Sequence, residues 1–180
     1  PSPGAEVFQA LIDSRFAGTE WAVRESATHA KSKTYRRADL VAAARTAGIP
    51  VVPIPGPSAV ATALSAAGLP ADRYLFLGFV PRKGAERARL LARAADEEWS
   101  VVLFEAPTRL GALLHDLARV AGPARVAAVA RELTKVHEEV RSGTLADLAD
   151  YYSEHEPRGE ITVVLAGTGS PAPQEDRTEE

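Results

Sequence analysis

The stretch Ser100–Val120, SVVLFEAPTRLGALLHDLARV, decides the fold class of this chain. It opens with a near-continuous apolar run, Ser100–Phe104, which is typical of a strand that is buried on both faces of a sheet. The segment that follows carries an apolar stripe at helical spacing, and Gly122-Pro123 ends the helix. The stripe consists of Leu110, Leu113, Leu114, Leu117 and Val120. The stretch therefore predicts a buried strand followed by an amphipathic helix.

The same alternation continues on both sides of this unit. Further strands are predicted at Val51–Ile54, Tyr74–Val80, Arg125–Ala130, Val136–Arg141 and Ile161–Leu165. Further helices are predicted at Ala38–Ala47, from Pro57 to Gly68, at Arg82–Ala95 and, capped by Thr144, at Leu145–Ser153. Strands that alternate with helices predict an α/β domain, and we expect a mixed, mostly parallel sheet flanked by helices.

The composition is that of a folded domain, with 46% hydrophobic and 25% charged residues among 180. The absence of cysteine excludes disulfides, a thiolate zinc site and a cysteine nucleophile, and four scattered histidines predict no metal site. A net charge of -3 excludes a nucleic-acid-binding protein that is basic over its whole surface, but it is compatible with a local RNA-binding patch. No apolar run approaches ~18 residues, so we expect a cytoplasmic protein without a membrane span.

The two ends of the chain differ from its middle. Residues 1–37 contain a polar, weakly periodic stretch that we cannot assign to the sheet. Residues 168–180 carry little apolar surface to bury, so we expect a disordered tail there. The predicted organisation is an atypical N-terminal segment over 1–37, an α/β domain over 38–167 and the tail.

A turn with the sequence Pro55-Gly-Pro-Ser-Ala59 lies between a predicted strand and a predicted helix. The free N–H groups of the first helical turn and the Ser58 hydroxyl can hold a ligand carboxylate or hydroxyl there. A strand-to-helix turn without a ligand explains the same residues.

Carboxylates stand at the ends of three predicted strands, namely Glu105, Glu132 and Glu160. Open α/β sheets gather their binding groups at strand ends, which makes these residues candidates for a ligand site. Singly, each also fits a helix cap or an ion pair. The sequence does not show whether all three lie at the same edge of the sheet.

A positive stripe follows the predicted strand that ends at Val80. It contains Arg82, Lys83, Arg87, Arg89 and Arg93 against Glu86 alone. Such a stripe suits phosphate contacts, whereas the alternative is a solvated helix face.

Several motifs, taken in chain order, resemble the C-terminal half of the ribosomal RNA small subunit methyltransferase I family, a branch of the tetrapyrrole methylase superfamily. They span about residues 38–166 and are Ala47–Ala59 (AGIPVVPIPGPSA), Leu69-Pro70, Phe76–Lys83 (FLGFVPRK), Phe104–Arg109 (FEAPTR), Ala130–Lys135 (ARELTK), His137–Glu139 (HEE) with Gly143–Leu145 (GTL), and Pro157–Glu160 (PRGE).

This resemblance implies transfer of a methyl group from S-adenosylmethionine to the ribose 2'-hydroxyl of a cytidine in small-subunit (16S) ribosomal RNA. It also implies a homodimer whose subunits hold the cofactor in a cleft between two α/β domains. The residues that it implies for cofactor binding are Pro57, Ser58, Ala59, Phe104, Glu105, Arg131, Glu132, Glu160 and Ile161. Arg82, Lys83 and Arg87 would face RNA phosphate, and Glu105 and Glu132 are candidates for a general base.

The chain departs from the family at its N-terminus. Family members carry an N-terminal domain with Gly-Thr-Pro and Asp-Pro-Gly loops, whereas the corresponding place here reads Lys33–Asp39, KTYRRAD. We therefore expect the activity in the intact enzyme and weak or absent catalysis by these 180 residues. Two alternatives stay open: a superfamily methylase that acts on a tetrapyrrole or on a modified histidine of a protein, as in diphthine synthesis, and a non-catalytic RNA-binding or dimerisation module.

Overall fold

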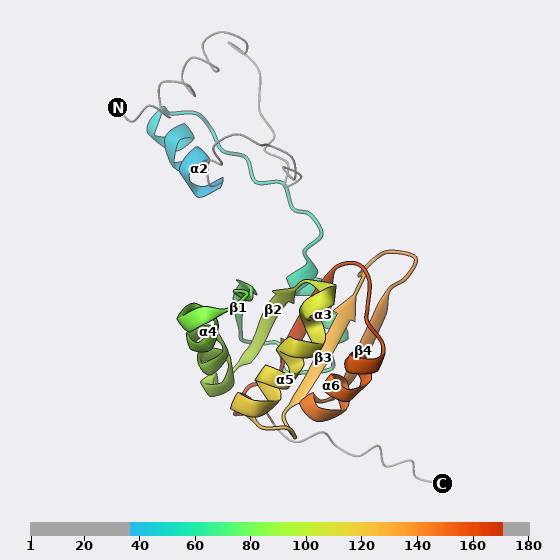
Figure 1. Cartoon of the computed structure of the whole chain (residues 1–180). Coiled ribbons are helices and arrows are strands. Elements are labelled where there is room, and N and C mark those ends of the chain that lie inside the picture. The colour runs from blue at the N-terminus through green and yellow to red at the C-terminus, as the bar shows by residue number, and fades with distance from the viewer. Residues whose placement is uncertain (1–36, 171–180) are drawn as a thin grey trace. The chain divides into compact units, whose positions relative to one another are not determined.

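The computed structural model describes residues 37–170, and the chain divides into two units between Gly56 and Pro57 (Figure 1). Residues 1–36 of the predicted N-terminal segment and residues 171–180 of the predicted tail lie outside the described residues. In the first unit, helix α2 (Arg37–Thr46) confirms the helix predicted there.

The strand predicted at Val51–Ile54 is wrong. These residues form no regular element, and the side chains of Val52 and Ile54 are 66% and 67% exposed. A strand needs a hydrogen-bonded neighbour, and no described strand pairs with this segment.

The second unit contains a five-stranded sheet with the order β1-β2-β5-β3-β4. The strands are β1 (Tyr74–Phe79), β2 (Ser100–Glu105), β3 (Val126–Arg131), β4 (Glu139–Thr144) and β5 (Ile161–Leu165). The helices are α3 (Ala59–Ala66), α4 (Gly84–Asp96), α5 (Leu110–Ala121), which follows a short 3-10 turn at Pro107–Arg109, and α6 (Leu145–Glu154). These elements confirm the α/β class, the predicted helices and four of the five strands predicted in this unit. The strand predicted at Val136–Arg141 is displaced, because residues 136–138 belong to the loop after β3 and β4 begins only at Glu139.

The sheet is mostly antiparallel, so the expected mostly parallel sheet is wrong. Among the described strands only β1 and β2 pair in parallel, whereas β5 is antiparallel to both β2 and β3. The short connection 132–138 cannot hold a crossover helix, so the chain reverses between β3 and β4. The crossover through α6 then gives β5 the direction of β4, and β5 enters the sheet between β2 and β3.

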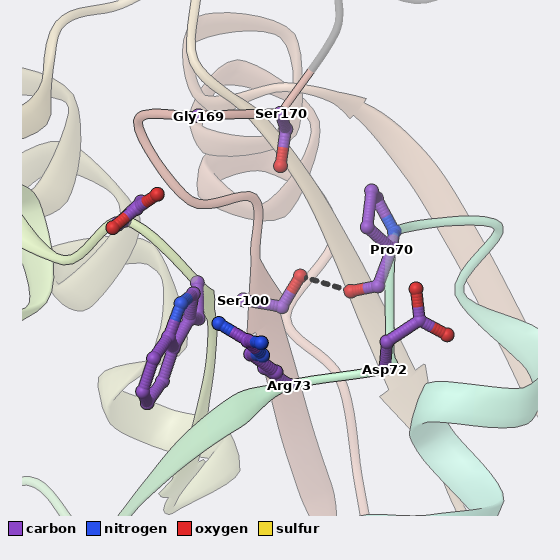
Figure 2. Close-up of a pocket in the computed structure, with 8 residues that line it drawn as sticks. Pro70, Asp72, Arg73, Ser100, Gly169 and Ser170 are labelled. Carbon is purple, nitrogen blue, oxygen red and sulfur yellow. Dashed lines mark hydrogen bonds between the residues drawn. The ribbon is translucent and has the colours of Figure 1, made fainter.

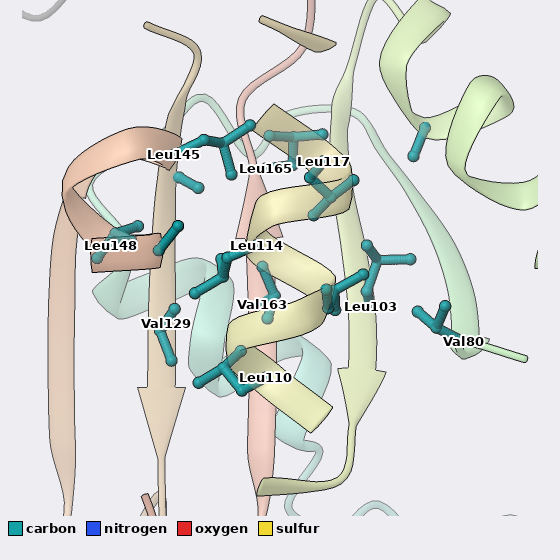
Figure 3. Packing of buried hydrophobic residues seen from close by; sticks show 14 of the residues in the cluster. Val80, Leu103, Leu110, Leu114, Leu117, Val129, Leu145, Leu148, Val163 and Leu165 are labelled. Atoms are coloured by element: carbon teal, nitrogen blue, oxygen red, sulfur yellow. The ribbon is translucent and has the colours of Figure 1, made fainter. Parts of the chain in front are cut away.

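Both faces of the sheet are covered by helices because the central strands are apolar on both sides. Helices α4, α5 and α6 pack on one face, where the leucines of α5 meet Leu103, Val129 and Val163 (Figure 3). Helix α3 packs on the other face through Ala63 and Leu64. The predicted stripe of α5 is buried at all four leucines, whereas Val120 in the last turn is 44% exposed.

The cap at the start of α6 is as predicted. The Thr144 Oγ1 atom accepts a hydrogen bond from the Asp147 N–H at 3.1 Å, which satisfies one free donor of the first turn. None of the described helices combines the length and the apolar character that crossing a bilayer requires.

Candidate functional site

The three strand-end carboxylates lie at one edge of the sheet. Glu105, Ile161 and Arg131 are paired in register across β2, β5 and β3. Glu132 directly follows β3, and Glu160 directly precedes β5. The carboxyl ends of β2 and β3 therefore meet the amino end of β5, which answers the question that the sequence left open.

Side chains at this edge point to opposite faces of the sheet. Phe104, Thr162 and Ala130 form the register row next to Glu105, Ile161 and Arg131. Neighbouring rows face opposite sides because side chains alternate along a strand. The row with Thr162 faces α3, and the row with Glu105 faces α5.

A cavity of about 200 Å³ opens on the α3 face. Its walls are the start of α3, the loop that follows β3, and the start of β5 with the residue before it: Pro57, Ser58, Ala59, Thr62, Leu133, Thr134, Lys135, Glu160 and Thr162. Four residues predicted from the sequence therefore meet in one cavity, namely Pro57, Ser58, Ala59 and Glu160.

The amino end of α3 forms the polar wall of this cavity. Ser58 has extended backbone geometry, and its side chain makes no capping hydrogen bond to the helix. Its carbonyl oxygen accepts from the Thr62 N–H at 2.9 Å and from the Thr62 Oγ1 at 2.8 Å. The Ser58 hydroxyl and the positive end of the helix dipole can therefore bind an acceptor or an anion.

Glu132 and Lys135 hold the opposite wall together. The Lys135 Nζ lies 2.9 Å from the Glu132 Oε1 and 3.0 Å from the Glu160 Oε2. The Glu160 N–H donates to the Glu132 Oε1 at 2.8 Å. This N–H, and after it the Lys135 ammonium, lowers the pKa of Glu132, and the bond to Glu132 raises the pKa of Lys135. The carboxylate and the ammonium are both charged near neutral pH.

Gly159 is required next to this cluster. Its φ of 91° is strained for residues with a side chain, and an added Cβ would overlap the Glu132 carboxylate. The motif Arg158-Gly-Glu160 thus allows Glu132 to lie against the backbone ahead of β5.

Glu105 faces away from the cavity. Its side chain is fully buried, forms an ion pair with Arg109, lies 3.8 Å from Arg87 and accepts from the Ala106 N–H at 2.8 Å. Arg131, on the same face, pairs with Glu139 at 3.1 Å. The geometry therefore does not bring the predicted side chains of Glu105, Arg131 and Ile161 to the cavity, although their strands form its edge.

The predicted RNA-facing residues separate into two kinds. Arg82 and Lys83 are exposed just ahead of α4. Arg87 is only 13% exposed, and its guanidinium binds Asp116 at 2.8 Å and the carbonyl oxygen of Pro81 at 3.0 Å. Arg87 therefore joins α4 to α5 and is not free to meet a phosphate.

Sequence reasoning missed several cavity residues, namely Thr62, Leu133, Thr134, Lys135 and Thr162. Thr162 had a usable signal, because it is the polar residue of the apolar run Ile161–Leu165. Lys135 had a weaker one, its spacing of three residues from Glu132.

A larger cavity of about 470 Å³ lies at the other end of the strands, beside the amino ends of β1 and β2, and contains no residue predicted from the sequence (Figure 2). In it the Ser100 Oγ donates to the carbonyl oxygen of Pro70 at 2.6 Å, and the Arg73 guanidinium lies 5.7 Å from the Trp99 ring centroid. The smaller cavity is the candidate site, because the strand ends and the start of α3 converge there.

Comparison with protein families gives a match over residues 32–149 to the family described as tetrapyrrole (corrin/porphyrin) methylases. The chain is 54% identical over 128 residues to ribosomal RNA small subunit methyltransferase I of Mycobacterium tuberculosis, covering 71% of this chain and 45% of that protein. It is 46% identical over 139 residues to the protein of the same name from a Synechocystis species, covering 77% and 48%. The chain thus spans about half the length of the curated relatives it matches.

Solved structures share the fold. The methyltransferase CobJ superposes with a TM-score of 0.55 at 19% identity, covering 73% of this chain and 59% of that chain. The uroporphyrin-III-C-methyltransferase of Thermus thermophilus gives a TM-score of 0.50 at 26% identity, covering 71% and 56%.

Proposed function

The chain belongs to the tetrapyrrole methylase family, and from that premise we propose that its second unit forms one wall of the S-adenosylmethionine site of a ribosomal RNA methyltransferase. The reaction is methylation of a cytidine ribose 2'-hydroxyl in small-subunit (16S) ribosomal RNA. The observation that carries the proposal is a cavity between Ser58 and Glu160 in a chain 54% identical to ribosomal RNA small subunit methyltransferase I. Because the chain spans about half of such relatives, the activity is proposed for an enzyme of their length.

The cavity fits part of the cofactor. Its volume of about 200 Å³ is below the roughly 300 Å³ at which pockets for a drug-sized ligand begin, so a second wall is needed to enclose the whole molecule. Ser58 and the free N–H groups of α3 offer donors, Glu160 offers an acceptor, and Leu133 offers an apolar surface. These groups match the hydroxyls, amines and purine ring of S-adenosylmethionine.

When bound, the cofactor supplies an electrophilic methyl group on a sulfur that is already a good leaving group. The residues of this chain contribute mainly by orientation. The clamp between Glu132, Lys135 and Glu160 holds the loop after β3 in place, and a rigid wall supplies the proximity effect that such a transfer needs.

The described geometry does not favour either predicted base. Glu132 has a lowered pKa and its Oε1 already accepts two hydrogen bonds, and Glu105 is buried on the other face. A weakly basic carboxylate is a poor acceptor for an alcohol proton. We therefore assign positioning to Glu132 and support of the β2–α5 connection to Glu105.

The partners follow from the same proposal. Small-subunit ribosomal RNA is the macromolecular substrate, the enzyme is a homodimer, and its place is the cytoplasm, where ribosomal subunits are available.

Radioactive methyl transfer tests the proposal. The enzyme that contains this region is incubated with labelled S-adenosylmethionine and unmethylated small ribosomal subunits, and the label is mapped on the RNA. We expect it on a cytidine ribose. Label on uroporphyrinogen or on a protein histidine would contradict the assignment in favour of another methylase of the family, and RNA binding without any transfer would favour a non-catalytic module.

Calorimetry with S-adenosylmethionine tests the role of a single wall. We expect weak or no binding by the 180-residue chain. Micromolar affinity would show that this wall alone is sufficient to bind S-adenosylmethionine.

A further inference from the structure

Phenylalanine rings gather on the same sheet face as the candidate site. The ring of Phe104 lies edge-on to the ring of Phe76, with centroids 4.9 Å apart, and to the ring of Phe79, at 5.4 Å. We call Phe76, Phe79 and Phe104 the phenylalanine surface. Phe76 is 44% exposed and Phe79 is 68% exposed, although large apolar side chains on a buried sheet face are normally covered.

This surface is continuous with the cavity. Phe79 pairs with Phe104 across β1 and β2, and Phe104 pairs with Thr162 across β2 and β5. Thr162 lines the cavity and is 4% exposed. Neighbouring strands are about 4.8 Å apart, and β2 lies between β1 and β5. β1, which carries Phe79, therefore runs about 10 Å from β5, which lines the cavity.

Helix α3 leaves the phenylalanine surface open. Its buried residues Ala63 and Leu64 pack in the cluster that contains Ala128 and Val164 of the central strands. The exposed rings belong to the edge strand β1, beyond this cluster.

Positive charge follows the strand that carries these rings. Arg82 and Lys83 follow Phe79 closely in sequence, and both are exposed. The Val80 N–H donates to the carbonyl oxygen of Phe104 at 3.2 Å, which keeps the start of this segment beside the phenylalanine surface. Exposed aromatic rings on a sheet, next to exposed cations, are the arrangement by which proteins bind unpaired nucleotides.

We propose that Phe76 and Phe79 stack on unpaired bases of the RNA substrate while Arg82 and Lys83 contact its phosphates. This proposal rests on the proposed function and adds the means by which the target segment is held next to the cavity. The exposed cations that follow β1 favour an anionic partner over a second copy of the chain, which would carry the same cations.

Fluorescence anisotropy with a labelled short oligocytidylate tests the proposal on the full chain, without cofactor. We expect Phe79→Leu to weaken binding about 10-fold, because it keeps an apolar side chain but removes the aromatic face. Phe79→Trp should retain the affinity, since indole also stacks. Trp99→Leu is the matched control, because Trp99 is 41% exposed and precedes β2, at the opposite end of the strands from Phe79. Circular dichroism checks that each variant is folded.

The outcomes separate this proposal from the proposed function. Equal affinity of the wild-type chain and Phe79→Leu, or no binding of oligocytidylate by the wild-type chain, overturns it. A change of molar mass in light scattering without a change in RNA affinity also overturns it and assigns the surface to an interface between copies. If methyl is transferred to small-subunit RNA but affinity does not depend on Phe79, only this inference fails. If affinity depends on Phe79 but no methyl reaches RNA, only the proposed function fails.

Discussion

Two hydrogen bonds join Glu132 to Glu160. The Glu132 N–H donates to the carbonyl oxygen of Glu160 at 3.0 Å, and the Glu160 N–H donates to the Glu132 carboxylate at 2.8 Å. Glu132 has a φ of 49°, a left-handed backbone conformation that is unfavourable for a residue with a side chain and that these two hydrogen bonds help to hold. This pair fixes the loop after β3 to the start of β5 and so shapes one wall of the cavity.

Removing the Glu132 carboxylate should loosen this wall. In Glu132→Ala the Glu160 N–H loses its acceptor, so we expect its amide hydrogen exchange to accelerate about 10-fold or more. Nuclear magnetic resonance measures the exchange rate. Glu154→Ala, which removes an exposed carboxylate at the end of α6, is the control and should leave the rate unchanged. Unchanged exchange in Glu132→Ala would show that the carboxylate does not hold the loop.

The clamp should be insensitive to pH over a wide window. The hydrogen bond from the Glu160 N–H, and after it Lys135, lowers the pKa of Glu132 from 4.5. The contribution of Glu132 to the stability of the fold is therefore present above pH 4.5 and is lost only as the pH falls through the lowered pKa. The hydrogen bonds to Glu132 and then to Glu160 raise the pKa of Lys135 from 10.5. The contribution of Lys135 to stability is therefore present below pH 10.5 and is lost as the pH rises through the raised pKa. Carbon chemical shifts should give a Glu132 midpoint below 4.5 that moves upward in Lys135→Met. A wild-type midpoint at or above 4.5 would contradict the clamp.

Gly159→Ala should destabilise the domain. The positive φ and the overlap of the new Cβ with Glu132 predict a loss of about 1–3 kcal/mol in the free energy of unfolding. The matched control is Gly143→Ala, where the nearest atom to an added Cβ is the Leu148 Cγ at 3.8 Å. Urea denaturation compares the two variants, and equal stability would show that Gly159 is not constrained.

Arg87→Ala should lower stability. Its guanidinium is bonded to Asp116 and lies near the buried Glu105, so truncation should cost about 2 kcal/mol of unfolding free energy. Arg89→Ala, an exposed position on the same helix, should change stability by less than about 0.5 kcal/mol. A loss of RNA affinity at unchanged stability in Arg87→Ala would instead support the phosphate role predicted from the sequence.

Tyr152→Phe should leave the free energy of unfolding unchanged or raise it by up to about 1 kcal/mol. The hydroxyl of Tyr152 is buried without a hydrogen-bond partner in the described structure, and burial, with a smaller effect of the nearby Glu139, raises its pKa to about 12. Thermal and urea unfolding measure the change. A loss of more than about 1 kcal/mol would reveal a partner for this hydroxyl.

Local patterns in the sequence were sufficient for most of the elements themselves. The apolar run at Ser100–Phe104, the leucine stripe of α5 and the Thr144 cap each depend on residues a few positions apart, and the structure confirms all three. The strand at Val51–Ile54 failed because apolar composition does not supply a hydrogen-bonded neighbour.

Strand direction, the face of each strand-end side chain and the partner of each charge were decided by tertiary structure. The sequence placed Glu105, Glu132 and Glu160 at strand ends, but their separation into a buried ion pair on one face and a clamp on the other follows from where β5 enters the sheet. The sequence likewise does not distinguish Arg87 from the other arginines of α4, because its partner Asp116 lies on α5. The physical reason is that periodicity records which side of an element is buried, whereas the neighbour on that side is chosen by contacts between residues far apart in the chain.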